Sequence, residues 1–586
     1  MSWSPIVRPA ALALVSAVVC VAAPKSSLPG GYFAAMEEGV ARVQARLDAE
    51  PRATLHDIEE TTGWRHFPHA ILAVAVLYTS KAPENRSQGD PKKLALAIRI
   101  GDLTADADER GVFSDRLDSH RDTYMWLEAY RLLEAKLDDG RRTRWKACLM
   151  RNAATLAARC LQWRDVAAYN YHFLGTSTNH FALWATDVMI AGELFKREDW
   201  LVLGRHILRR LATEEQSPDG YWGEYSSAGP TSGYNLLTLS AVGLYWEYTQ
   251  DPRALTALRR ATGFHEYFTY ADGQPVETIN DRNRYWDSSL YGNFAFTHFA
   301  EGRAFARFLF ERFPASRLDM EPLGRIAQNA LYYHAGPLAA IPQQSERYAH
   351  RLAGPAGIRK RGPWVATLSG LIATEPASAR WFLERQSHVS VFHERAGLII
   401  TGGNSRAQPE LATFSETIQG HTYYLPLWSK LQMGDAADRL WLAYNSFSSE
   451  IAVQEDEGPD LRLRFAVRGR GAPPEKAGMA LQLCLKEGEE LITGTGLRVR
   501  LGSEKLTLSP NQIGGRIEHH GWKLSTDATV SLTWPVFPYN PYRGGPEIHL
   551  DRAVGVLSAP LTWTPNHSHP AEQTIEFRLS VSRASR

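Results

Sequence analysis

Two adjacent residues, Asn179 and His180, place an amide beside an imidazole just before a mainly apolar stretch, Phe181 to Ala191. An amide can hold an anionic group, and an imidazole can move a proton near neutral pH. Tyr171 and His172 lie in the polar stretch that precedes them and are further candidates for the same site. A second interpretation is that Asn179 only caps the helix that follows, because asparagine is a favoured capping residue.

A second candidate segment runs from Asp219 to Leu239 and is rich in glycine and aromatic residues. Tyr234 follows a glycine at the expected start of a helix, where a phenol at the rim of a cleft could exchange a proton with a sugar. Trp222 and Tyr225 have flat rings that can stack on sugars, and Glu224 stands between them as a polar contact. The alternative is that Tyr234 is a half-buried packing residue.

A third segment, Glu277 to Trp286, is an unusually polar loop between two expected helices. Arg282 and Arg284 lie among aromatic residues, and a guanidinium group can bind a carboxylate through two parallel hydrogen bonds. Trp286 adds another flat ring that can stack on a ligand. The alternative is a solvated loop with local ion pairs.

Helices are expected to position these segments, because apolar residues recur with helical spacing up to about residue 385. The connections are rich in glycine, proline, aspartate and asparagine, which favours antiparallel helix pairs arranged as a toroid or solenoid. No fixed repeat length is present, so a regular repeat array is not expected. The predicted helical stripes cover residues 35–48, 65–80, 121–135, 145–160, 181–195, 198–212, 234–249, 253–268, 289–311 and 321–333.

Short alternating runs replace the helical pattern after residue 385 and predict an antiparallel β-sandwich. Examples are 389–392, 397–401, 461–467 and 574–581. The predicted fold is therefore a multidomain α+β chain. A helical (α/α) toroid covers residues 24–384, and an antiparallel β-sandwich covers residues 385–586.

Composition narrows the classes of function. The 586 residues are 44% hydrophobic and 22% charged, as in globular proteins. The 65 Lys and Arg balance 64 Asp and Glu, and the basic run Arg359–Arg361 is short, so a nucleic-acid partner is not expected. The 17 Trp and 23 Tyr suit a large core or flat ligands such as sugars.

The first 23 residues resemble a secretory signal peptide. Arg8 precedes an uncharged run of 14 residues from Ala10 to Ala23, which is short for a membrane span. No later run is long enough for a membrane helix, so we expect a secreted or periplasmic protein. Cys148 and Cys160 lie 12 residues apart in one expected helix, too far apart to form a disulfide, so a disulfide framework is not expected.

Taken together, these motifs resemble the alginate-lyase and heparinase II/III-like polysaccharide lyases. The resemblance rests on Asn179-His180 before an apolar helix, an aromatic Asp-Gly loop, and the helix start Tyr234-Asn235-Leu236. Residues 392–405 also resemble the opening of the sheet domain of these enzymes, in which an (α/α) toroid precedes an antiparallel β-sandwich. Thr178 departs from the pattern, since alginate lyases often have a second Asn there, and residues 226–232 lack the basic residue that commonly precedes the Tyr.

The resemblance implies cleavage of a uronic-acid polysaccharide by β-elimination, which leaves a C4–C5 double bond. The site must neutralise the uronate carboxylate before the C5 proton can leave. The resemblance assigns this task to Asn179, with Arg282 or Arg284. Either Tyr234 acts as both base and acid, or His180 removes the proton and Tyr234 donates one to O4. The sequence does not decide between these routes, and Tyr225 would replace Tyr234 if Tyr234 is structural.

The sequence is also compatible with two other functions. A glycoside hydrolase on the same helical toroid would need paired carboxylates, for which Glu224, Asp281 and Glu277 are candidates. A non-catalytic polysaccharide-binding protein would need only the aromatic residues. In each case the partner is a polysaccharide or oligosaccharide, and for a lyase it is anionic. The sequence does not predict the oligomeric state.

No cofactor is expected. Some of the resembling lyases hold zinc or calcium in the sheet domain, and His393 and His421 are available there. Their spacing matches no recognised ligand motif, so the prediction for the site is that it contains no metal.

Overall fold

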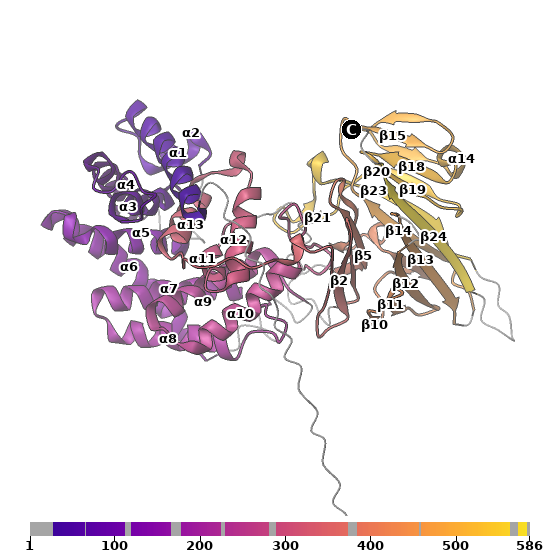
Figure 1. Cartoon of the computed structure of the whole chain (residues 1–586), viewed down its shortest axis with the longest axis horizontal. Helices are drawn as coiled ribbons and strands as arrows, with labels where there is room; N and C mark the ends of the chain where they lie inside the picture. The colour runs from indigo at the N-terminus through magenta and orange to yellow at the C-terminus, as the bar shows by residue number, and fades with distance from the viewer. Residues whose placement is uncertain are drawn as a thin grey trace, which may run out of the picture.

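We describe a computed structural model over residues 27–64, 66–111, 119–165, 177–223, 229–280, 289–372, 384–455, 459–470, 472–562 and 572–582. The predicted signal peptide, residues 1–23, lies outside these ranges. Figure 1 shows a helical N-terminal domain beside a C-terminal β domain, as predicted. Among the described residues, no helix combines the length and apolar character needed to cross a membrane.

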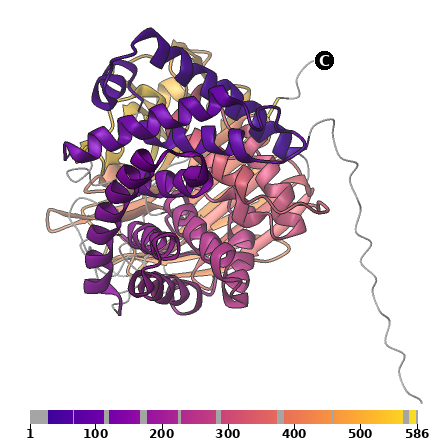
Figure 2. The ribbon, with the colours of Figure 1, turned by 90° about the vertical axis from the view of Figure 1, so that its left-hand side faces the viewer.

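The helical domain is a two-layered (α/α) toroid. Inner helices α3, α5, α7, α9, α11 and α13 each pack against the next, and α13 returns to α3, so the described helices close a ring (Figure 2). The bounds are α1 (Leu28–Ala49), α2 (Leu55–Thr62), α3 (Ala70–Thr79), α4 (Pro91–Glu109), α5 (Ser119–Leu133), α6 (Asp139–Trp163), α7 (Thr178–Phe195), α8 (Glu198–Thr213), α9 (Ser232–Thr249), α10 (Pro252–Tyr267), α11 (Asn293–Phe296), α12 (Ala300–Arg312) and α13 (Met320–Leu331).

The sequence of each helix matches its layer. The inner helices α7 and α9 are buried on most sides and have long runs of apolar and small residues. The outer helix α6 is amphipathic, and its buried face is the predicted stripe from Trp145 to Cys160. Gly101 of α4 is required by close approach, because a Cβ there would lie 2.1 Å from the Trp145 ring. Both described cysteines of α6 are free thiols, as expected.

The β domain is a sandwich of two antiparallel sheets. The first sheet contains β1 (Arg347–Arg351), β2 (Ala356–Arg361), β3 (Trp364–Ser369), β5 (Val389–His393), β6 (Gly397–Thr401), β8 (Phe414–Ile418), β9 (His421–Tyr423), β14 (Lys476–Leu483), β17 (Leu506–Leu508), β20 (Ser531–Val536) and β23 (Val554–Pro560). The second contains β10 (Trp428–Gln432), β11 (Asp438–Ala443), β12 (Phe447–Glu455), β13 (Leu461–Gly469), β15 (Glu490–Thr493), β16 (Arg498–Arg500), β18 (Arg516–His519), β19 (Trp522–Ser525) and β24 (Glu572–Val581).

Alternating side chains fix the register of these sheets. In the pair β13–β24, Leu463 lies opposite Phe577 and Phe465 lies opposite Ile575, and all four are buried in the core between the sheets. A short helix, α14 (Pro510–Ile513), and two small sheets complete the domain. These sheets are β4 (Glu384–Ser387) with β7 (Gly403–Ser405), and β21 (Tyr539–Asn540) with β22 (Gly545–Pro546).

The sheet begins earlier in the chain than the predicted boundary at residue 385. β1, β2 and β3 precede that residue, yet β3 pairs with β5 in the first sheet. The basic run Arg359–Arg361 lies on β2 and is used internally: Arg359 forms a two-pronged ion pair with Asp438 at 2.6 and 2.8 Å. Lys360 pairs with Glu394 at 2.6 Å, and Arg361 donates to the Asp435 carbonyl group at 2.7 Å, so each member of the run has a partner within the fold.

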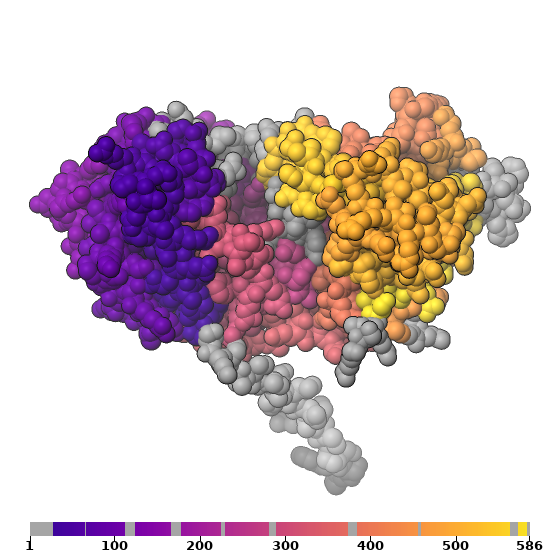
Figure 3. All heavy atoms as spheres, turned by 90° about the horizontal axis from the view of Figure 1, so that it is seen from above, coloured from indigo at the N-terminus to yellow at the C-terminus, as the bar shows by residue number. Residues whose placement is uncertain are grey.

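The two domains share a hydrophobic core at their junction. Tyr270, in the loop after α10, stacks on Phe392 of β5 with ring centroids 4.7 Å apart. Tyr221 and Ile279 from the helical half, and Val365 from the sheet, belong to the same buried cluster. In Figure 1 the β21 segment lies on the side of the sandwich that faces the helices, and Figure 3 shows the yellow C-terminal part of the sandwich projecting toward the helical domain.

Candidate functional site

Asn179 and His180 lie in the first turn of α7. The helix begins at Thr178, with Ser177 in the capping position, so the interpretation of Asn179 as the cap is wrong. Asn179 is instead 2% exposed, whereas His180 is half-buried. The first turn of a helix carries the positive end of its dipole, which favours bound anions. Asn179 therefore lies where a carboxylate would be stabilised.

Tyr234 lies in the first turn of α9 and is half-buried. Its hydroxyl group hydrogen-bonds to the hydroxyl group of Tyr542, which lies between β21 and β22 of the sandwich domain. The β21–β22 turn is itself held in place: Tyr542 N donates to Asn540 Oδ1 at 2.9 Å, and Asn540 Nδ2 donates to Glu547 at 2.7 Å. A residue of the second domain thus reaches the proposed catalytic tyrosine.

The starts of α7 and α9 lie at the same end of the toroid. α7 and α8 form a helical hairpin through Lys196 and Arg197, so α8 ends near the start of α7. Trp222 connects the end of α8 to the start of α9. Its indole N–H donates to Leu211 O in α8 at 2.8 Å, and its backbone N–H donates to Asn235 Oδ1 in α9 at 2.8 Å.

These contacts correct the prediction for Trp222. Its side chain is 1% exposed and packs in the toroid core, so it fixes the loop before α9 and offers no face to a sugar. Asn235 also donates to His265 Nε2 at 2.8 Å. His265 is buried, and burial lowers its pKa to about 3, so its ring is neutral and can accept this hydrogen bond.

The turn 277–280 attaches the start of α9 to the sandwich. Asn280 Oδ1 accepts a hydrogen bond from Ser232 N, the first residue of α9, at 3.3 Å, and its carbonyl accepts one from Asn404 of β7 at 3.0 Å. Arg385 of β4, which is buried, donates to the carbonyl groups of Thr278 and Ile279. Sequence reasoning missed Arg385 and Asn404, since nothing in a local pattern indicates which distant backbone groups they bind.

Glu277, a candidate carboxylate for the hydrolase alternative, is 1% exposed, and both of its carboxylate oxygens accept hydrogen bonds. One of its oxygens accepts hydrogen bonds from Gly402 N and Thr278 Oγ1, each at 3.0 Å, and the other from the Tyr270 hydroxyl at 3.1 Å. Burial is the main influence on this group and raises its pKa to about 7. Glu277 therefore links the helical half, through Tyr270 and Thr278, to the sandwich, through Gly402.

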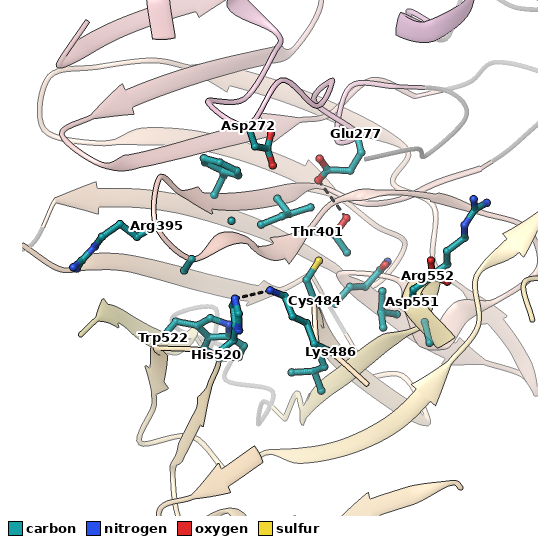
Figure 4. A pocket seen from close by; sticks show the side chains of 18 of the residues that line it. Asp272, Glu277, Arg395, Thr401, Cys484, Lys486, His520, Trp522, Asp551 and Arg552 are labelled. Carbon is teal, nitrogen blue, oxygen red and sulfur yellow. Dashed lines mark hydrogen bonds between the residues drawn. The ribbon is translucent and has the colours of Figure 1, made fainter. Parts of the chain in front are cut away.

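A pocket of about 490 Å³ opens at the junction beside Glu277 (Figure 4). Thr401, Cys484 and Lys486 from the sandwich line it, together with Asp272 from the helical half. Burial raises the pKa of the Cys484 thiol above its ordinary range, so the thiol is protonated and unreactive at neutral pH. This pocket contains none of the residues predicted for elimination chemistry.

Eight other predicted residues lie outside the described residues: Tyr171, His172, Glu224, Tyr225, Asp281, Arg282, Arg284 and Trp286. His393 and His421, the histidines considered for a metal in the sheet domain, are both described. His393 is buried and its Nδ1 accepts a hydrogen bond from Arg395 N at 3.1 Å, whereas His421 is exposed at the start of β9. Neither belongs to a group of three potential ligands among the described residues.

Neither protein-family models nor curated protein sequences match this chain. The comparison with solved structures does find matches. The chain resembles the chondroitin AC lyase of Streptomyces coelicolor A3, solved with chondroitin sulphate, with a TM-score of 0.52 and 13% identity over 96% of this chain and 81% of that one. The chain shares the fold of that lyase. This likeness confirms the predicted toroid-plus-sandwich architecture of polysaccharide lyases.

Two looser matches do not alter this assignment. A heparan sulfate lyase mutant of Pedobacter heparinus has a TM-score of 0.46, at 12% identity over 88% of this chain and 75% of that one. A β-L-arabinofuranosidase of Geobacillus stearothermophilus T6 has a TM-score of 0.29, at 13% identity over 96% of this chain and 99% of that one.

Proposed function

We propose that this chain is an exported polysaccharide lyase that cleaves a uronic-acid-containing polymer by β-elimination. The observation that carries the proposal is the position of Tyr234. It lies in the first turn of α9 and its hydroxyl group hydrogen-bonds to that of Tyr542, while Asn179 and His180 lie in the first turn of α7 at the same end of the toroid. The fold shared with a chondroitin AC lyase supports the proposal. The leader-like residues 1–23 are the basis for export.

In the proposed reaction, the Asn179 amide donates a hydrogen bond to the uronate carboxylate beside the positive end of α7. This contact disperses the negative charge that builds up as the C5–H bond breaks. The electron pair of that bond forms the C4–C5 double bond, and the C4–O bond breaks. A base takes the C5 proton and an acid returns one to O4, so no water is consumed.

Tyr234 fills one or both of these proton-transfer roles. If the base and the leaving oxygen lie on the same face of the sugar, Tyr234 begins as the phenolate, takes the C5 proton and then gives it to O4. If they lie on opposite faces, His180 takes the proton and Tyr234 donates its own. The Tyr542 hydroxyl group can donate a hydrogen bond to the Tyr234 oxygen and so stabilise its phenolate, which is the starting base in the first route and forms on proton donation in the second.

Ultraviolet absorbance during incubation with uronate polymers tests the proposal, because only elimination creates an absorbing C4–C5 double bond. The panel contains chondroitin, heparan, hyaluronan, alginate, glucuronan and pectate. We expect rising absorbance with at least one polymer, and loss of that signal in Tyr234→Phe. New reducing ends without absorbance would overturn the lyase assignment and favour a hydrolase that uses Glu224 and Asp281. Binding without either product would favour a polysaccharide-binding protein.

A further inference from the structure

Glu247, His298 and His334 converge at the end of α9 opposite to Tyr234. Glu247 lies near the C-terminus of α9, His298 follows α11, and His334 follows α13. Each offers one ligand atom, and these atoms all lie within 4.8 Å of one another. Glu247 Oε1 is 2.7 Å from His334 Nε2 and 3.4 Å from His298 Nε2. Sequence reasoning did not associate these three residues, because they come from distant segments of the chain.

Hydrogen bonding within this group leaves one nitrogen unsatisfied. The His298 side chain is only 5% exposed, and its buried Nε2 makes no hydrogen bond. The nearest carboxylate oxygen, Glu247 Oε1, is already hydrogen-bonded to His334. A buried polar atom without a partner is costly. A cation held by both imidazoles and the carboxylate satisfies all three groups at once.

The surroundings hold the three ligands in place. Trp246 packs edge-on against the His298 ring with centroids 5.8 Å apart, and His334 N donates to Thr297 Oγ1 at 3.0 Å. Arg303 ties the two histidine-bearing segments together, because it donates to Thr297 O at 2.7 Å and to Pro337 O at 2.8 Å. Such outer contacts fix the orientation of metal-binding side chains. The charge of Arg303 opposes a bound cation, but its guanidinium donates to these carbonyl groups.

We propose that Glu247, His298 and His334 form a divalent metal site that binds zinc. Two imidazole nitrogens and one carboxylate oxygen are a ligand set that zinc accepts with a tetrahedral geometry. A tetrahedral zinc with bonds of ~2.1 Å separates its ligands by about 3.4 Å. The His298–Glu247 distance already equals this separation, and His334, which is 39% exposed, can move to reach it. Solvent would occupy the fourth position.

The site is placed for a structural role. Glu247 lies 13 residues beyond Tyr234 on α9, about 20 Å along the helix axis, so a metal there does not reach the proposed site of elimination. The metal would instead join the end of α9 to the segment after α13, which leads into β1. It would therefore strengthen the connection between toroid and sandwich, and this inference is independent of the proposed function.

Metal titration of chain purified without a polyhistidine tag and stripped with chelator tests the site. We expect one Zn²⁺ per chain by calorimetry, and visible absorption typical of tetrahedral cobalt when Co²⁺ is the probe. His334→Ala and Glu247→Gln should each weaken binding at least tenfold and remove the rise in melting temperature that Zn²⁺ gives the wild type.

The matched control is His206→Ala. His206 forms a simple surface pair with Asp165 at 3.1 Å, and neither residue belongs to a group of three ligands among the described residues. This variant should bind Zn²⁺ as the wild type does. If wild-type chain binds no stoichiometric Zn²⁺ or Co²⁺, or if the site variants bind as tightly as His206→Ala, the proposal is overturned. His334→Ala keeps the test valid if Glu247→Gln fails to fold, because His334 is partly exposed and its loss leaves the toroid core intact.

Discussion

The hydroxyl groups of Tyr234 and Tyr542 hydrogen-bond to each other across the domain junction, although the two residues are 308 positions apart in the chain. Tyr234 belongs to the toroid and Tyr542 to a turn of the sandwich. The sandwich therefore sets the environment of the side chain that we propose as acid or base. The junction core and the turn 277–280 fix the distance between the two domains, so the contact depends on the whole interface.

Tyr234→Phe should abolish elimination while leaving the fold intact. The substitution removes only the hydroxyl group, and loss of a positioned acid or base lowers a rate by about 100- to 10,000-fold. Initial rates of absorbance increase on the responsive polymer measure this effect. Unfolding by urea should show a loss of only about 1 kcal/mol, the usual net value of one hydrogen bond.

Tyr245→Phe provides a control on the same helix. Tyr245 donates its hydroxyl hydrogen to Asp251 at 2.7 Å near the C-terminal end of α9, far from Tyr234. Its loss should cost about 1.5–3 kcal/mol of stability, because Asp251 is charged, and leave the elimination rate within about twofold of the wild type. Equal activity losses in the two variants would show that helix stability, and not proton transfer, limits the rate.

Tyr542→Phe should lower kcat by about 10- to 100-fold, because a hydrogen bond to a charged group contributes about 1.5–3 kcal/mol. The effect should appear in kcat and little in KM, since the phenolate that Tyr542 stabilises acts in proton transfer and not in substrate binding. Steady-state kinetics on the responsive polymer separates the two parameters. A change confined to KM would instead indicate that Tyr542 only contacts the substrate.

Much of the fold could be predicted because large apolar residues report their burial directly. The stripe from Trp145 to Cys160 is the buried face of α6, and β11 alternates buried and half-buried residues along its whole length. α4 was missed because its buried face includes Ala97, Gly101 and Ala105, which carry little hydrophobic signal. β2 was missed because its Arg and Lys residues form internal ion pairs and conceal the strand pattern.

The site was less predictable because its contacts join distant segments. Asn179, His180 and Tyr234 could be selected by residue type and by their position at helix starts. Tyr542 lies in a turn with no periodic pattern, and its contact with Tyr234 depends on how two domains dock. Trp222 was misjudged for a related reason: an aromatic residue in a glycine-rich loop suggests exposure, but the Leu211 carbonyl on α8 and the Asn235 side chain on α9 hold it in the core.

Asn179→Ala should lower kcat/KM by about 100-fold or more, because the uronate charge would lose its stabilising amide. Asn152→Ala is a control on the outer helix α6, where Asn152 donates to Asp108 at 2.6 Å. The control should retain wild-type kinetics on the responsive polymer. If Asn179→Ala remains fully active with normal folding, the carboxylate is neutralised by other residues.

Glu277 should make the stability of the protein depend on pH. Its pKa is about 7 in the folded chain because of burial, against an ordinary value of 4.5. The folded state therefore holds this proton more tightly than the unfolded state. The resulting stability is fully present below about pH 4.5 and is lost as the pH rises through about 7, with a total change of ~3 kcal/mol.

Glu277→Gln should remove this pH dependence, because the amide keeps an acceptor for Gly402 N and never ionises. Urea unfolding at about pH 5 and about pH 8 should show a decline of up to ~3 kcal/mol in the wild type and a smaller decline in the variant. Glu416→Gln is the matched control, since Glu416 is also 1% exposed but accepts hydrogen bonds from Asn445 and Ser446 within the sandwich. If Glu277→Gln declined as steeply as this control, the pH dependence would have to arise from other groups.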